Sequence, residues 1–158
     1  MDIKCKEITL ESLKYIKSDI SILPNNYLSL NENHKYSSTA LSFYKYMKNK
    51  IKDEEKSIDF YDEPLLLEEK RSGDWFAPIL YISSNILIPL GVSMISNYLT
   101  DYFRGQRKPK ATIKIVHKNN KGSMIEASFD ISAEDVDNLD QEKIKAISNT
   151  IQRVINEE

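Results

Sequence analysis

The chain has few of the residues on which common catalytic and metal sites depend. Its 158 residues include one cysteine, Cys5, and two histidines, His34 and His117. A single cysteine cannot form an internal disulfide, and these three residues cannot build a four-ligand Cys/His zinc site. We therefore expect a reducing compartment, with the cytoplasm as the default, and we assign no catalytic residue, no metal site and no cofactor.

Glycine, proline and net charge are also low. Only 4 glycines and 5 prolines occur, and the glycines are too scattered to form a phosphate-binding loop. The formal net charge of −2 provides no general attraction to nucleic acid or anionic lipid. The opening residues, MDIKCKEITL, contain no apolar core of a secretory signal, so we expect no signal peptide.

Lysine, isoleucine and asparagine are overused in the chain. There are 18 lysines against 4 arginines, together with 20 isoleucines and 12 asparagines. Codons for these three residues are AT-rich, which favours a bacterium or a phage with an AT-rich genome as the source. At 41% hydrophobic and 29% charged residues, the composition is that of an ordinary globular domain.

Helical spacing of apolar residues predicts a helix-rich N-terminal part. One helix is expected over 9–20 and a second over 38–56, the latter with a stripe of Leu41, Tyr44, Met47 and Ile51. The most apolar segment, 76–103, is expected to form a long helix. Pro89 and Gly91 should kink it into pieces over 76–88 and 90–103.

The same apolar segment is long enough to raise a membrane alternative. A span needs about 20 mostly apolar residues, and 76–99 has that length. Serines and asparagines within it are costly in lipid, so we favour shielding by protein. An inner-membrane protein with one span over 76–99 stays as the alternative.

The last third of the chain shows a different pattern. Apolar and polar residues alternate in KATIKIVHK and SMIEASFDIS, and the intervening NNKG predicts a hairpin turn. Residues 141–157 have the stripe of an amphipathic helix. The predicted fold class is therefore α+β, with a helical part over 1–104 and a ββα tail over 105–158 docked on it as one compact unit.

Polar and aromatic residues in and beside the apolar segment suggest an interaction surface. Small polar side chains on an apolar helix allow close helix approach and cross-helix hydrogen bonds, and a tryptophan can anchor a partner. The candidate surface comprises Trp75, Phe76, Asn85, Ser93, Asn97 and Tyr98. An ordinary buried helix, whose serines bond to its own carbonyls, is the competing interpretation.

A basic cluster follows the apolar segment. Its candidate phosphate contacts are Arg104, Arg107, Lys108, Lys110, Lys114 and Lys118. The basic strand KATIKIVHK lacks aromatic residues for base stacking, apart from His117. Lysines that protect an edge strand are the alternative explanation.

A metal-dependent nuclease is the third interpretation that we consider. Asp59 or Asp62, followed by Glu68 and Lys70, resembles a pattern in which carboxylates bind Mg²⁺ and a lysine orients a water. The Glu-x-Lys pattern is common by chance in a chain this rich in both residues.

We therefore predict a non-enzymatic interaction or assembly subunit of a bacterial multi-protein complex. An accessory component of a phage-defence or related conflict system is the specific form that we favour. A protein partner or self-association is expected, and nucleic-acid binding through the basic cluster or attachment to a membrane is left open.

Overall fold

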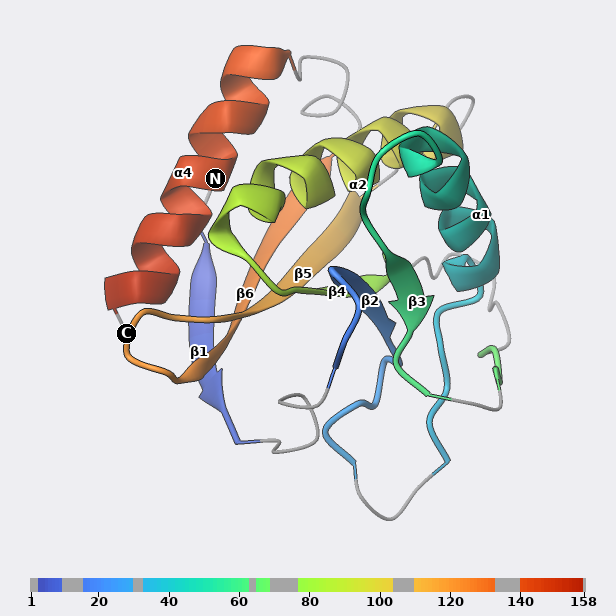
Figure 1. Cartoon of the computed structure of the whole chain (residues 1–158), viewed down its shortest axis with the longest axis horizontal. Helices are drawn as coiled ribbons and strands as arrows, with labels where there is room; N and C mark the ends of the chain where they lie inside the picture. The colour runs from blue at the N-terminus through green and yellow to red at the C-terminus, as the bar shows by residue number, and fades with distance from the viewer. Residues whose placement is uncertain are drawn as a thin grey trace.

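The computed structural model describes residues 3–9, 16–29, 33–62, 65–68, 77–103, 110–132 and 140–157. Within these ranges, six strands form one mixed sheet in the order β1-β6-β5-β4-β2-β3 (Figure 1). The strands are β1 (Lys4–Ile8), β2 (Ile20–Leu23), β3 (Ile58–Phe60), β4 (Ile79–Ile82), β5 (Lys110–Lys118) and β6 (Met124–Ser132). Strand pairs β4–β5 and β2–β3 are parallel, and the other neighbours are antiparallel.

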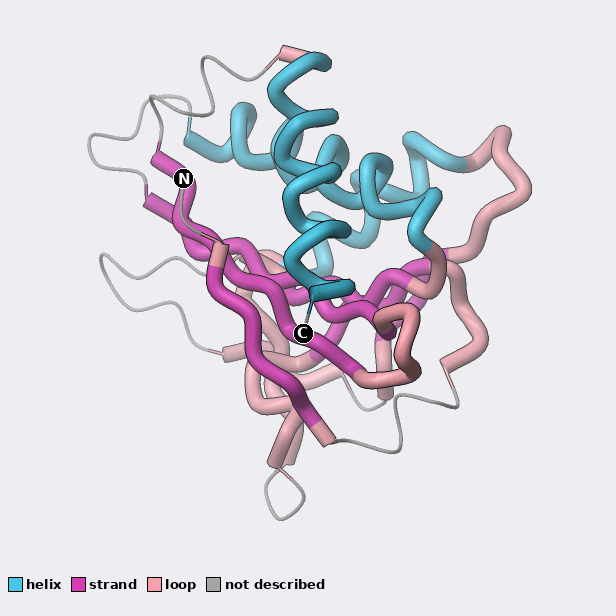
Figure 2. The backbone as a smooth tube through the Cα atoms, turned by 90° about the vertical axis from the view of Figure 1, so that its left-hand side faces the viewer, coloured by secondary structure: helices cyan, strands magenta, loops and turns pink. Residues whose placement is uncertain are grey.

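The helices cover one face of this sheet (Figure 2). They are α1 (Ala40–Ile51), the short 3₁₀ helix η2 (Asn85–Leu87), α2 (Ile88–Phe103) and α4 (Gln141–Glu157). One row of side chains crosses all six strands beneath them and joins the main core: Cys5, Ala127, Ile115, Leu80, Ile22 and Phe60. Burial of this row against the helices accounts for the apolar side chains that the strands carry on this face.

The opposite side of the sheet, which we call the distal face, is more polar. Its central row crosses the strands in the order Lys6, Glu126, Val116, Tyr81, Ser21 and Asp59. A second, smaller apolar cluster forms here around Leu23, Tyr27 and Tyr81. The distal face therefore combines buried polar groups with aromatic rings.

The prediction of a long kinked apolar helix over 76–103 is wrong. Residues 79–82 form β4, a central strand that is buried throughout, and the helix begins only at Ile88. A short apolar run buried on both faces cannot be told from a buried helix by periodicity alone. Pro89 marks the first turn of α2, where its missing N–H costs little. Across the described ranges, no helix has the length and hydropathy that a bilayer crossing requires.

The prediction of a helix-rich N-terminal part is also wrong. Residues 4–8, 20–23 and 58–60 are strands, and most of the helix expected over 9–20 lies outside the described residues. The second predicted helix is present as α1 but is shorter. Its buried stripe runs through Ala40, Phe43, Met47 and Ile51, whereas Leu41 is exposed. Pairing with distant strands, rather than local helical spacing, decides these segments.

The predicted hairpin and closing helix are present. Strands β5 and β6 pair over nine residues each, and Gly122 closes the turn with a φ of 88°, which favours glycine. Both strands lie inside the sheet, where β6 pairs with β1 and β5 pairs with β4. Residues from both sides of the 104/105 boundary therefore share one sheet.

Candidate functional site

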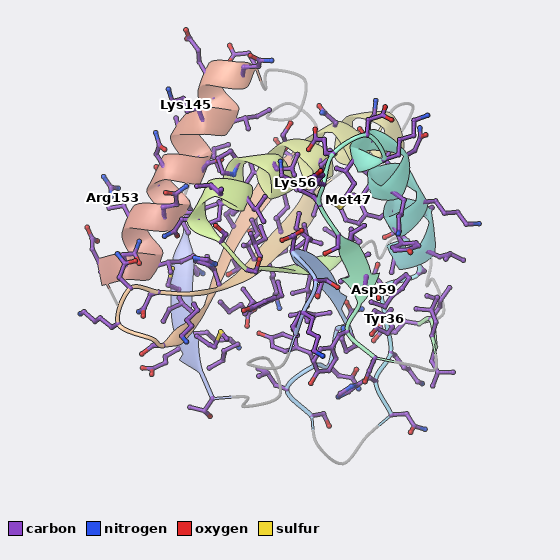
Figure 3. All side chains as sticks on the ribbon, viewed as in Figure 1. Tyr36, Met47, Lys56, Asp59, Lys145 and Arg153 are labelled. Carbon is purple, nitrogen blue, oxygen red and sulfur yellow. The ribbon has the colours of Figure 1, made fainter. Side chains whose placement is uncertain are left out.

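His34 joins three segments at the β3 side of the molecule. Its Nδ1 lies 2.5 Å from Oδ2 of Asp62, and its Nε2 lies 2.9 Å from the backbone oxygen of Ser29. The hydroxyl of Tyr36 donates to Oδ1 of Asp62 at 2.7 Å. Figure 3 labels Tyr36 and Asp59 at the β3 side of the molecule, where the ring of Tyr36 also packs edge-on against Phe60. Asp62 is therefore the centre of a connected polar cluster.

The partners of His34 determine its charge. Both ring nitrogens face oxygen acceptors, so both contacts are satisfied only when both nitrogens carry a proton. Burial alone lowers the pKa of His34, but the hydrogen bonds to Asp62 and Ser29 outweigh it and raise the pKa above its usual value. His34 therefore acts as a cationic clamp between a carboxylate and a carbonyl.

Next to this clamp is a cavity of about 500 Å³, which we call the His34 cavity. Strands β2 and β3 form one side of it through Ser21 and Asp59, which are register partners. The polar and aromatic residues around it include Lys17, Ser21, His34, Asp59, Tyr61 and Asp62. It is thus built from segments far apart in the sequence.

A second cavity, of about 370 Å³, lies against β4 and β5 and includes Glu68 and Lys114 in its lining. The amide of Asn25 donates to Oε2 of Glu68 at 3.1 Å. Glu68 therefore lines a different cavity from Asp59 and Asp62, and Lys70 lies outside the described residues. In the described part of the chain, no three His, Cys, Asp or Glu side chains are grouped closely enough to hold a metal ion.

The second histidine, His117, lies in the core near the end of β5. Its Nδ1 is 2.5 Å from the carbonyl of Ile82, and its Nε2 is 2.8 Å from the amide oxygen of Asn85. Burial lowers its pKa more than the bond to Ile82 raises it, so the ring is neutral at pH 7. A neutral ring donates from Nδ1 and accepts at Nε2. Both contacts are therefore satisfied when the NH₂ group of Asn85, and not its oxygen, faces Nε2, and the orientation of a side-chain amide is assigned from such contacts.

The candidate interaction residues fall in several different environments. Trp75 and Phe76 lie outside the described residues, Ser93 is half-buried, and Asn97 is exposed. Asn85 is an internal partner of His117. Tyr98 joins α2 to α1, because its ring packs 5.3 Å from that of Phe43 and its hydroxyl lies 2.6 Å from Oγ of Ser42. Among the described candidates, Asn85 and Tyr98 therefore make contacts within the fold, whereas Ser93 and Asn97 lie one helical turn apart on α2 with part of their surface exposed.

The candidate basic patch is described only in part. Arg104, Arg107, Lys108 and the side chain of Lys110 lie outside what the structure describes. Lys114 is 3.6 Å from Oε1 of the buried Glu126, and Lys118 is exposed at the far end of β5. The two lysines are four residues apart along β5, which corresponds to about 13 Å. Part of the charge on Lys114 is offset by Glu126.

Sequence reasoning missed Ile86, the most exposed large apolar side chain in the described part of the chain, at 82% of its maximum. It lies in η2, between Asn85 and the buried Leu87. No local signal could have identified it, because its neighbours Leu87 and Ile88 are equally apolar and are buried. Only the position of η2 in the fold decides which of these three side chains faces solvent.

Comparison with protein-family models, curated proteins and solved structures finds no match to this chain. The site must therefore be interpreted from its own geometry.

Proposed function

We propose that the protein is a non-enzymatic interaction subunit of a bacterial multi-protein complex, with Ile86 as an anchor of the interface. One observation carries this proposal: an isoleucine with 82% of its surface exposed projects from η2, whose backbone is hydrogen-bonded to α4. The cytoplasmic location and the role in phage defence or a related conflict system stay predictions from the sequence.

One corner of the fold consists of η2, the β5–β6 turn and the C-terminal end of α4, where the turn lies beside the helix end (Figure 1). Gln152 donates to the carbonyl of Asn85 at 3.2 Å. The backbone N–H of Asn120 donates to the side chain of Asn156 at 3.0 Å, and the amide of Asn119 donates to the carbonyl of Ile155 at 3.4 Å. The first of these bonds ties η2 to α4, and the other two tie the β5–β6 turn to the end of the same helix.

A fixed apolar side chain is well suited to binding. Burying an isoleucine releases about 1.5–3 kcal/mol, and an ordered backbone loses little conformational entropy when a partner docks. On this basis Ile86 would strengthen an association by roughly 10- to 100-fold. Single exposed apolar residues are common on protein surfaces, so the rigid setting of Ile86 is what favours an interface.

The state of both histidines also favours a non-enzymatic role. Each ring nitrogen of His34 and His117 is engaged by another group of the same chain. Neither ring can accept a substrate proton as a general base without losing an internal hydrogen bond. The residues most often used for acid–base catalysis are thus occupied with holding the fold together.

The test compares Ile86→Glu with a matched control, Leu41→Glu, which places the same charge on the exposed side of α1. Tagged wild type and both variants are purified from the native host, and their masses are measured by size-exclusion chromatography with light scattering. We expect a defined complex with wild type and Leu41→Glu, and its loss with Ile86→Glu at an unchanged thermal unfolding temperature. A monomeric wild type without a stoichiometric partner, or a complex that Ile86→Glu leaves intact, would contradict the proposal.

A further inference from the structure

The His34 cavity is lined by one buried hydroxyl group whose hydrogen bonds are unaccounted for. Ser21 lines the cavity and is only 1% exposed, and its Oγ forms no hydrogen bond with any group the structure describes. Buried hydroxyls without partners are costly and call for a ligand or ordered water.

The charges around the cavity balance. Lys17 and the imidazolium of His34 contribute two positive charges, and Asp59 and Asp62 contribute two negative charges. His34 and Asp62 already neutralise each other at 2.5 Å. A cation would meet repulsion from Lys17, whereas an anion would meet repulsion from Asp59. The cavity therefore favours a ligand without net charge.

Asp59 provides a free acceptor at the rim. Its Oδ1 accepts the backbone N–H of Phe60 at 2.8 Å, while no group in the described ranges donates to its Oδ2. A carboxylate in this state can accept hydrogen bonds from neighbouring hydroxyls, which is how acidic residues recognise a ribose. The ring of Tyr61, which lies 5.8 Å from that of His34, supplies a flat apolar wall.

We propose that the His34 cavity binds a neutral, hydroxyl-rich ligand whose sugar ring packs on Tyr61, whose vicinal hydroxyls contact Asp59 and whose inner hydroxyl contacts Ser21. The volume of about 500 Å³ suits a monosaccharide or a nucleoside, because small-molecule sites commonly occupy about 300–1,000 Å³. Both sources share the same chemistry, a sugar ring with adjacent hydroxyls.

Ligand-observed NMR and calorimetry on the intact chain can test this with ribose, glucose and adenosine as neutral probes, and with inorganic phosphate and ethanolamine as charged ones. We expect saturable binding of at least one neutral probe and weaker binding of both charged probes. Adenosine binding more tightly than ribose would identify a nucleoside site, and glucose binding at least as tightly as adenosine would identify a free-sugar site. Absence of binding by all three neutral probes at millimolar concentration, or preference for a charged probe, would overturn the proposal.

Variants assign the binding to this cavity. Asp59→Asn should weaken binding of the neutral probe by at least tenfold, and Ser21→Ala should weaken this binding independently. Asp53→Asn, a change of the same kind at another exposed acidic residue, should leave it unaltered. Each variant is first checked for wild-type thermal unfolding, and Ser21→Ala still decides the question should Asp59→Asn prove unstable. Unchanged affinity in both cavity variants would show that the ligand binds elsewhere.

Discussion

Nδ1 of His34 lies 2.5 Å from the carboxylate Oδ2 of Asp62, which ties together segments 28 residues apart. On the other side of the ring, Nε2 faces the carbonyl of Ser29. Two acceptors around one imidazole make the protonated ring a structural element. The charge of His34 thereby links the stability of this end of the molecule to pH.

Removing His34 should flatten the pH dependence of stability above neutrality. The folded pKa of His34 is raised above the unfolded value of about 6.5. Its contribution is therefore complete below pH 6.5 and is lost as the pH rises through the folded pKa. The free energy of unfolding, measured with urea, should fall more between pH 6 and pH 8 for wild type than for His34→Gln. Equal losses would mean that His34 is not protonated in the folded state.

His117 should act in the opposite direction and in a lower pH range. Its folded pKa is lowered, so its stabilising effect is present above pH 6.5 and is lost as the pH falls through the folded value. His117→Leu should lower stability at pH 7 by about 1–3 kcal/mol, because the carbonyl of Ile82 loses its donor. The same variant should lose less stability than wild type between pH 7 and pH 5 in guanidinium titrations. A steeper acid loss in the variant would count against a neutral, buried ring.

Glu126 should tolerate substitution far less well than its partners. Its carboxylate is 4% exposed and contacts Lys6 at 3.4 Å, Lys114 at 3.6 Å and the hydroxyl of Tyr27 at 2.9 Å. Glu126→Ala leaves the hydroxyl of Tyr27 without its acceptor at a buried position and should cost about 1–3 kcal/mol. Lys6 is 61% exposed, so Lys6→Ala should cost less than about 1 kcal/mol. Denaturant midpoints at pH 7 give both values, and similar costs for the two variants would contradict this ranking.

Gly91 should be required because α2 packs directly on β4. A Cβ at this position would lie 2.6 Å from Cδ1 of Ile82, a side chain fully buried in the core. Gly91→Ala should therefore destabilise the protein by about 1–2 kcal/mol, even though alanine favours helix by about 1 kcal/mol. Ile82→Val removes the clashing carbon, and in that background Gly91→Ala should be neutral or stabilising. A double-mutant cycle measures this coupling, and additive effects would place the helix further from the strand.

Several local elements could be predicted from the sequence. The β5–β6 hairpin and α4 each have a long periodic pattern, and the turn between β5 and β6 contains a glycine where a positive φ is needed. Helix α1 was placed correctly, although Phe43 rather than Leu41 faces the core. These features depend on neighbours within one helix or one hairpin, so local spacing is enough to reveal them.

The central strands were not predictable in the same way. Strands β2 and β4 have four residues each, and a short apolar run has no period that separates a buried strand from a buried helix. Pairing to β5, more than 25 residues further along the chain, decides the structure of β4. Long-range pairing contributes hydrogen bonds and burial that outweigh local helical preference.

The sequence by itself determined the scarcity of cysteine and histidine and the elements of the last third of the chain. Only the tertiary structure decided which side chains meet, because strand register places Ser21 beside Asp59, and the fold brings His34 to Asp62. It also decided that Ile86 faces solvent while Leu87 and Ile88 are buried. Such contacts arise from the packing of distant segments, and the order of residues along the chain carries no local signal for them.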